Sequence, residues 1–397
     1  MSPPAVLTGL DHLLADPQRI SALQGQRLGL LVNPTSVTAD LDHAIEALQR
    51  AGLTLVRLFG PEHGVRADAQ DMEAVDETID PISGLPSVSL YGHTFESLLP
   101  RPEHLADLDC VICDIQDIGA RYYTYVYTIG LMMKACGEAG VRVLILDRPN
   151  PINGLHIEGN ILHQSFHSFV GMQPLPNRHA MTTGELANFF SRFGGWDCDF
   201  EVIPMKGWRR SMWFDQTGLP WVMPSPNMPT LDTAAVYPGQ CLLEGTNLSE
   251  GRGTTRPFEL FGAPYLDAPA LLEYLQNFQI SGVALRLAAF RPMFQKHAGQ
   301  TCRGLQIHIT DREQFRSLTL SYAILAGALA LHPEEFAWRQ QAYEFVADRL
   351  AIDLLLGDDQ IRLHLEAGGD PLTLAESFSS ARQTFLEQRQ QCLLYHD

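Results

Sequence analysis

The sequence contains no apolar run long enough to cross a membrane. Its longest run, Tyr322 to Leu331, has about half of the roughly 20 residues that a spanning helix needs, so we expect a buried helix there. The amino terminus also lacks the basic segment and following apolar segment of an export signal. We therefore expect a cytoplasmic protein without a membrane partner, or a periplasmic or secreted one if a leader has been removed.

Basic residues are few in this chain. The 28 Lys and Arg residues are outnumbered by 46 Asp and Glu residues, which gives a formal net charge of −18. Such a charge repels the phosphate backbone, so it argues against a nucleic-acid partner. An anionic substrate would have to meet arginines placed locally in its binding site.

Cysteines are also few, and the seven present are spread over the chain. An odd number without a regular spacing fits a reduced compartment and no disulfide framework. Cys110 and Cys113 match the C-x-x-C pattern, but they lie in a predicted strand, where positions three apart face opposite sides of the sheet. We predict two buried apolar side chains rather than a metal or redox pair.

The short motifs of several enzyme classes are missing. The first strand-to-helix turn reads Asn33-Pro34-Thr35-Ser36, so it contains neither a G-x-G-x-x-G dinucleotide fingerprint nor a phosphate-binding loop. The 14 histidines form no H-E-x-x-H zinc motif, and no serine lies in G-x-S-x-G. We therefore expect no cofactor and no metal, and carboxylates remain as the groups for catalysis.

What the sequence does contain is a series of short apolar segments that end in polar residues. Leu55 to Phe59, Cys110 to Cys113 and Val141 to Leu146 are such segments, and charged residues follow each of them. Together with Arg27 to Val32 and the helical segments between them, they predict an α/β fold with a doubly wound, mainly parallel Rossmann-like sheet. Ligands bind such sheets beyond the carboxyl ends of the strands.

Three prolines between Trp221 and Thr230 interrupt this pattern and predict a domain boundary. Residues 1–225 would form the Rossmann-like catalytic domain and residues 226–397 a smaller α+β domain. The second part reads as α+β because the strands Val283 to Phe290 and Gly304 to Thr310 lie close together and are followed by several helices.

Two further segments have a predicted role. The acidic stretch Ala67 to Asp80 is either a mobile flap over the site or a solvated loop, and we favour the flap because it begins close to Glu62. Thr182-Thr183-Gly184-Glu185 has the form of a capping box, which predicts the start of a helix.

Several carboxylates lie in or beside turn-bounded segments and are candidates for acid, base or charge-stabilising roles: Glu62, Asp114, Asp117, Asp147, Glu158 and Glu244. Each of them could equally cap a helix or pair with an arginine. Glu62 follows the sharpest strand end, at Gly60-Pro61, and is the first candidate.

A glycine-rich segment, Cys241 to Glu259, opens the second part of the chain. Its glycines would let the backbone approach a ligand closely, and Arg252 and Arg256 supply forked donors for a carboxylate. The alternative is a tight structural loop whose arginines pair with its own glutamates. We favour ligand binding, because the segment follows the predicted boundary and clefts commonly form between domains.

Four stretches of the chain, in order, resemble the exo-β-N-acetylmuramidases of peptidoglycan turnover. They are Gly60-Pro61-Glu62-His63-Gly64; Asp114 to Arg121 with Tyr122-Tyr123-Thr124-Tyr125; Asp147-Arg148-Pro149-Asn150-Pro151; and Glu244-Gly245-Thr246-Asn247 with Gly251-Arg252-Gly253-Thr254. The resemblance implies a glycoside hydrolase whose smaller carboxy-terminal domain closes the cleft and in which Glu62 is catalytic. It also implies that non-reducing terminal N-acetylmuramic acid is released from peptidoglycan fragments, which are then the expected partners.

We therefore predict a metal-independent exo-acting glycoside hydrolase with Glu62 as general acid and with Asp114 and Asp117 as further catalytic candidates. The predicted substrate-binding residues are His63, Arg121, Tyr123, Asp147, Arg148, Asn150, Glu244, Asn247, Arg252 and Thr254. Arg252 is the first candidate for binding the lactyl carboxylate of N-acetylmuramic acid. Two alternatives stay open, a sugar-binding protein without turnover and a substrate-assisted hydrolase of another N-acetylhexosaminide.

Overall fold

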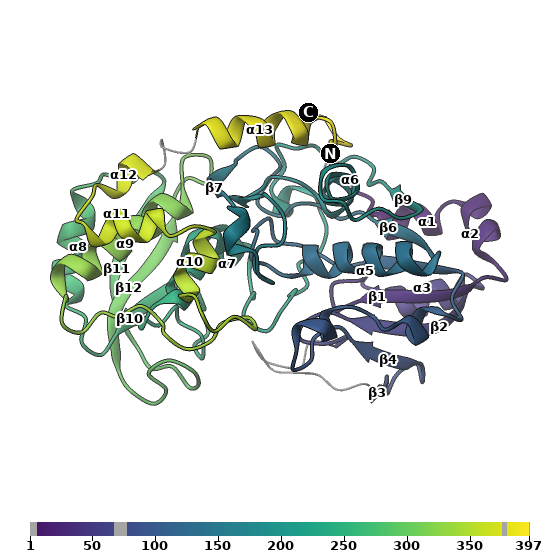
Figure 1. Cartoon of the computed structure of the whole chain (residues 1–397), viewed down its shortest axis with the longest axis horizontal. Coiled ribbons are helices and arrows are strands. Elements are labelled where there is room, and N and C mark those ends of the chain that lie inside the picture. The colour runs from purple at the N-terminus through teal and green to yellow at the C-terminus, as the bar shows by residue number, and fades with distance from the viewer. Residues whose placement is uncertain (1–5, 67–77, 375–378, 397) are drawn as a thin grey trace.

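The computed structural model of the chain describes residues 6–66, 78–374 and 379–396. The flap predicted at Ala67 to Asp80 lies almost wholly outside these residues. The described chain forms two units that lie side by side, each built on its own sheet (Figure 1).

A mainly parallel sheet forms the first unit, with the strand order β3-β4-β2-β1-β5-β6-β9. All neighbours in it are parallel except β3 and β4. Because β2 and β4 lie on one side of β1 while β5, β6 and β9 lie on the other, the strand order reverses at β1 and β5, where such sheets bind ligands. The strands are β1 (Arg27–Val32), β2 (Thr54–Gly60), β3 (Thr78–Ile79), β4 (Pro86–Ser89), β5 (Cys110–Asp114), β6 (Arg142–Leu146) and β9 (Phe200–Ile203).

Helices cover both faces of this sheet, which confirms the predicted doubly wound fold. One apolar core lies under α1 (Gly9–Leu14), α2 (Pro17–Leu23) and α3 (Ala44–Arg50), and a second lies under α5 (Tyr125–Ala139). Helix α4 (Pro102–Leu105) packs against α5, as does α6 (Thr183–Phe193), which begins at the predicted capping box. Cys110 belongs to the first core and Cys113 to the second, so the two buried thiols face opposite sides of the sheet, as predicted.

The second unit contains a smaller antiparallel sheet of β10 (Leu260–Ala263), β12 (Cys302–Ile309) and β11 (Val283–Phe290). Its helices are α7 (Leu231–Gln240), α8 (Ala268–Gln276), α9 (Ser317–Leu331), α10 (Ala351–Leu356), α11 (Gln360–Glu366) and α12 (Pro371–Leu374). The longest apolar run of the sequence is the buried helix α9, which packs against α7, α8, α11 and α12. None of the helices in the described part of the chain is long and apolar enough to cross a membrane.

The end of the chain returns to the first unit. Helix α13 (Ser379–Gln390) packs against α6 and against β7 (Glu158–Ile161), which pairs with β8 (Pro176–Arg178) in a short ribbon (Figure 1). The Tyr395 hydroxyl donates to Asp147 Oδ2 at 2.6 Å, and Asn188 Nδ2 donates to the Cys392 carbonyl at 3.2 Å. The last residues therefore stabilise the parallel sheet unit rather than the antiparallel one.

Arg121 ties the two units together and does not reach a ligand. Its side chain is fully buried, and its two terminal nitrogens donate to four backbone carbonyls at 2.8–3.1 Å. These carbonyls belong to Asn160 and Leu175 around the β7-β8 ribbon and to Leu355 and Leu356 in the last turn of α10. The cation also meets the negative end of that helix. The position of Arg121 therefore does not support the substrate-binding role that the sequence predicted, because both of its terminal nitrogens donate to the protein's own backbone.

Replacing Arg121 by methionine should lower the free energy of unfolding by about 3–5 kcal/mol, because four buried carbonyls lose their donors. Chemical denaturation monitored by circular dichroism would measure the loss. The exposed Arg209 is a matched control, and Arg209→Met should change the same quantity by less than about 0.5 kcal/mol. Equal effects of the two substitutions would contradict the structural role of Arg121.

Candidate active site

Glu62 lies directly after the end of strand β2. The Gly64 amide donates to the Pro61 carbonyl at 2.9 Å, which closes a tight turn around Glu62. Glycine is required where the strand ends, since a Cβ atom on Gly60 would lie 2.8 Å from the Val65 amide nitrogen. The turn places Glu62 at the carboxyl edge of the sheet with only 7% of its surface exposed.

His63, the next residue, has a left-handed backbone with φ of 71°. This conformation costs a non-glycine residue roughly 1–2 kcal/mol, and such strain is concentrated at functional sites. His63 also lines the same cleft as Glu62. The strained turn therefore supports the interpretation of this strand end as a site.

Helix α5 holds the Glu62 carboxylate. Thr124, the residue before the helix, donates from its hydroxyl to Glu62 Oε2 at 2.8 Å. The Tyr125 hydroxyl donates to the Pro224 carbonyl at 2.7 Å and lies 3.4 Å from the Glu62 carbonyl oxygen. Helix α5, which connects β5 to β6, thus fixes the Glu62 carboxylate at the end of β2.

The opposite wall of the cleft comes from the second unit. Glu244, in the 3₁₀ turn η4 (Cys241–Gly245), accepts hydrogen bonds from Arg252 Nη2 at 2.8 Å and from the Tyr343 hydroxyl at 2.7 Å. Burial opposes ionisation of Glu244, but Arg252 and Tyr343 outweigh it and hold the pKa of the carboxyl below its ordinary value. Arg252 also lies 3.5 Å from Glu250 and 5.1 Å above the Phe258 ring.

The two units close over this cleft. Tyr91 of the first unit donates to Glu344 Oε2 of the second at 3.1 Å, and Phe345 packs against the Tyr91 and Phe169 rings. The remaining cavity is only about 30 Å³, room for a few waters at most. It is lined by Glu62, His63, Tyr122, Tyr123, Thr124, Tyr125, Val170, Ser225, Asn227, Met228, Tyr237, Glu244, Arg252, Phe258, Tyr343 and Glu344.

The structure thus brings together five of the predicted site residues: Glu62, His63, Tyr123, Glu244 and Arg252. Sequence reasoning missed Tyr343 and Glu344, which lie in a polar segment with no apolar periodicity. It also missed Ser225 and Asn227, because the prolines around them predict only a domain boundary. No local pattern marks these four residues, since they reach the cleft only through the packing of the two units.

Asp114 and Arg148 do not reach this cleft. They form a buried bidentate pair, with Arg148 Nε 2.5 Å from Asp114 Oδ1 and Nη2 2.9 Å from Oδ2. Asp117 accepts from the Gly119 amide at 2.7 Å and lies 3.2 Å from His179 Nε2. The predicted catalytic roles of both aspartates and the predicted substrate contact of Arg148 are therefore not supported by where these side chains lie.

The other predicted contacts are structural or lie elsewhere. Asn150 donates to the Met181 carbonyl at 2.9 Å and accepts from the Ile152 amide at 3.2 Å. Thr254 donates to the Gly251 carbonyl within its own loop at 2.6 Å. Asn247 accepts from the Tyr265 hydroxyl at 2.7 Å and lines a separate, larger pocket.

Asp147 anchors the first unit instead of binding a ligand. Its carboxylate accepts from the Thr182 and Thr183 hydroxyls and from the Gly184 amide at the start of α6, and from Tyr395. Burial raises the pKa of this carboxyl to about 6, although the hydrogen bonds from Tyr395, Gly184 and Thr182 act in the opposite direction. Asp147 therefore explains how the sheet, α6 and the end of the chain are held together.

A Rossmann-like unit with a carboxylate at a strand end, closed by an α+β unit that adds glutamates and tyrosines, has the kinds of groups that glycosidases use. Within the described ranges, no three His, Cys, Asp or Glu side chains lie together as a metal site. The family described as exo-β-N-acetylmuramidase NamZ matches the chain twice, with its N-terminal part over residues 28–232 and its C-terminal part over residues 235–395. The chain belongs to this family of glycoside hydrolases.

Relatives with the same architecture cover nearly the whole chain. Peptidoglycan β-N-acetylmuramidase NamZ of Bacillus subtilis (strain 168) is 43% identical over 393 residues, which are 99% of this chain and 92% of that protein. A DUF1343 family protein from Bacteroides fragilis, whose crystal structure is known, is 34% identical in sequence to this chain. The two structures match with a TM-score of 0.86 over 98% of this chain and 99% of that one. A second such protein from the same organism is 29% identical, with a TM-score of 0.75 over 99% of both chains.

The raised pKa of Asp147 predicts a pH-dependent contribution to stability. Because the folded state binds this proton more tightly than the unfolded state, the contribution is full below pH 4 and is lost as the pH rises to about 6. Asp147→Asn cannot titrate. Its free energy of unfolding relative to the unmodified protein should therefore rise by up to roughly 3 kcal/mol between pH 4 and pH 6.

Urea denaturation at several pH values would measure this difference. Gln276→Ala, at an exposed position, is the control; it adds and removes no titratable group and should give a difference that does not vary with pH. A pH-independent difference for Asp147→Asn as well would contradict the assignment.

Proposed function

We propose that the chain releases non-reducing terminal N-acetylmuramic acid from peptidoglycan fragments by hydrolysis, with Glu62 as the general acid. The family and the name of the Bacillus subtilis relative support the substrate. The observation that carries the proposal for Glu62 is its placement: a carboxyl at a strand end, held by Thr124 at 2.8 Å, in a cleft between two units.

In this proposal Glu62 protonates the departing glycosidic oxygen while the sugar lies between the two walls of the cleft. The tyrosines of the lining provide flat apolar faces and hydroxyls, a combination suited to a sugar ring. A cavity of about 30 Å³ cannot hold a sugar, so the contact between Tyr91 and Glu344 has to open before substrate enters. Closure afterwards would exclude water from the reacting bond.

Arg252 remains our candidate for the lactyl carboxylate. Its guanidinium lines the cleft, and a cation there offsets the repulsion that a chain of net charge −18 exerts on an anionic sugar. Its pairing with Glu244 at 2.8 Å fixes the guanidinium in the cleft wall.

Glu62→Gln keeps the shape of the side chain and removes its proton. We expect kcat on a fragment with a sugar leaving group to fall by roughly two to four decades. The loss should be much smaller on a nitrophenyl glycoside, because nitrophenolate departs without protonation. Release of N-acetylmuramic acid, measured by chromatography, and of nitrophenol, measured by absorbance, gives both values.

The control for this experiment is Glu138→Gln, at an exposed position of α5, which should leave both rates unchanged. Unchanged turnover in Glu62→Gln would refute the role of Glu62. A native protein that binds the fragment but cleaves neither substrate would instead be a sugar-binding protein.

Arg252→Lys tests the selection of the lactyl group. If Arg252 binds the carboxylate, kcat/KM on the N-acetylmuramic glycoside should fall. The fall should correspond to a loss of roughly 1–3 kcal/mol of transition-state binding energy. Any activity on the matching N-acetylglucosamine glycoside should stay the same. Arg256→Lys is the control, since Arg256 is half-exposed and pairs with Glu259 at 3.3 Å. A parallel loss on both glycosides, with a lower melting temperature, would show that Arg252 only holds the loop.

A further inference from the structure

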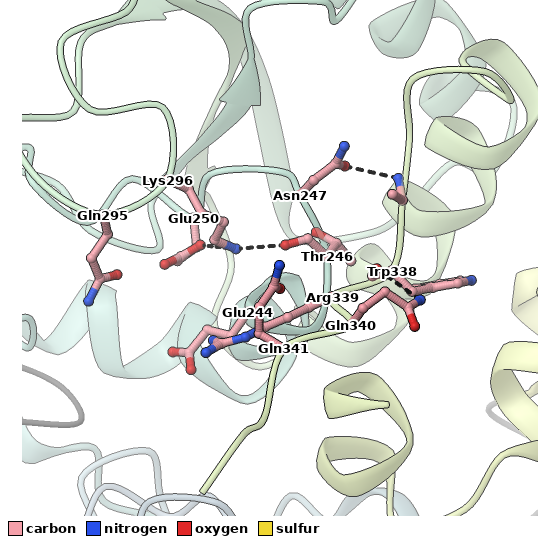
Figure 2. Close-up of a pocket in the computed structure, with 11 residues that line it drawn as sticks. Glu244, Thr246, Asn247, Glu250, Gln295, Lys296, Trp338, Arg339, Gln340 and Gln341 are labelled. Atoms are coloured by element: carbon pink, nitrogen blue, oxygen red, sulfur yellow. Dashed lines mark hydrogen bonds and ion pairs between the residues drawn. The ribbon is translucent and has the colours of Figure 1, made fainter. Parts of the chain in front are cut away.

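A second cavity lies in the second unit, beside the cleft and not in it. Its volume is about 590 Å³, within the range of pockets that hold small ligands. Figure 2 shows that three segments surround it: η4 with the residues that follow it, the loop between β11 and β12, and the stretch 337–341. The lining residues are Glu244, Thr246, Asn247, Glu250, Gln295, Lys296, Ala337, Trp338, Arg339, Gln340 and Gln341.

This pocket adjoins the cleft through a shared wall. Glu244 lines both cavities. It accepts a hydrogen bond from the hydroxyl of Tyr343, which lies just after the stretch 337–341. A ligand that extends from the cleft past Glu244 would therefore enter the pocket.

The charged side chains that line the pocket are equal in number, with Glu244 and Glu250 on one side and Lys296 and Arg339 on the other. Lys296 Nζ donates to the carbonyls of Leu243, Thr246 and Leu248 at 2.7–3.1 Å and lies 2.7 Å from Glu250 Oε2. Glu244 is held by Arg252 and Tyr343. The lining offers no excess of positive charge, so it is unsuited to an anion in a chain of net charge −18.

Side-chain amides and an indole dominate the rest of the lining. Gln295, Gln340 and Gln341 each carry an amide that can both donate and accept hydrogen bonds, as sugar hydroxyls and acetamido groups require. The Asn247 amide is used within the protein, because it donates to the Glu335 carbonyl and accepts from the Tyr265 hydroxyl. The half-buried Trp338 adds an aromatic face, and its Nε1 is fixed by a 2.7 Å hydrogen bond to Glu366. These groups fit a neutral, hydroxyl-rich ligand.

We infer that this pocket binds the saccharide on the leaving-group side of the scissile bond through its first sugar, the neutral N-acetylglucosamine. The inference rests on the proposed function, because an exo-acting enzyme holds one sugar on one side of that bond and a chain on the other. The pocket of about 590 Å³ beyond Glu244 has room for part of such a chain, whereas the space of about 30 Å³ around Glu62 would take the terminal sugar only after the cleft opens. A substrate with a saccharide leaving group would thus have a higher kcat/KM than the reactivity of that leaving group alone predicts.

The experiment compares two substrates with the same terminal N-acetylmuramic acid, one a nitrophenyl glycoside and the other an oligosaccharide of alternating N-acetylglucosamine and N-acetylmuramic acid. The variant is Gln340→Ala/Gln341→Ala, since both side chains are exposed at the pocket and outside the catalytic cleft. We expect kcat/KM on the oligosaccharide to fall about tenfold and the value on the nitrophenyl glycoside to change less than about twofold. The matched control, Gln276→Ala/Gln383→Ala, removes two exposed amides outside the pocket and should change neither value.

A binding measurement tests the pocket without turnover. Calorimetric titration with the released chain, an oligosaccharide that begins with N-acetylglucosamine, should show binding to the unmodified protein and about tenfold weaker binding to the variant. Equal losses on both substrates, no loss on either, or no binding of the released chain would overturn the inference. If the unmodified protein cleaves neither substrate but binds the chain in a way that depends on Gln340 and Gln341, the proposed hydrolysis fails while the pocket assignment stands.

Discussion

The buried guanidinium of Arg121 is the interaction on which the rest of this architecture depends. It joins the β7-β8 ribbon to the last turn of α10 through four backbone carbonyls. Taking a cation out of water is costly, and it is tolerated only where all its surroundings are acceptors. Because the cleft has one wall from each unit, the Arg121 contacts hold the two walls together at one end, whereas the contact between Tyr91 and Glu344 is the one that would open for substrate.

Buried charges in the first unit follow the same rule. Asp114 pairs with Arg148 at 2.5 Å, Glu158 with Arg178 at 2.7 Å, and Glu185 with Arg210 at 2.6 Å. Removing one member of such a pair leaves an uncompensated buried charge, so these residues are needed for folding. A motif rich in acids and arginines is therefore ambiguous in this fold. Glu62 differs from these three acids because its side chain lines the cleft.

One segment of the second unit connects the two cavities. Residues 337–341 line the larger pocket, and Tyr343 and Glu344 line the cleft. Glu344 and Phe345 both have left-handed backbones, with φ of 44° and 67°, and the contacts to Tyr91 hold them there. Occupation of the larger pocket and opening of the cleft therefore involve the same short stretch of chain. Strain of this kind is typical of segments that have two arrangements.

The sequence by itself determined the parallel sheet, the buried cysteines on opposite faces, the capping box of α6 and the place of Glu62 after β2. These features depend on local periodicity and on turn residues such as Gly60-Pro61, which act over a few positions. Only the tertiary structure decided which charged residues face the cleft. The partner of Asp114 lies 34 positions away and the tyrosine that binds Glu244 lies 99 positions away. Burial forces each charge onto whichever opposite group the fold brings near, and no local pattern encodes that choice.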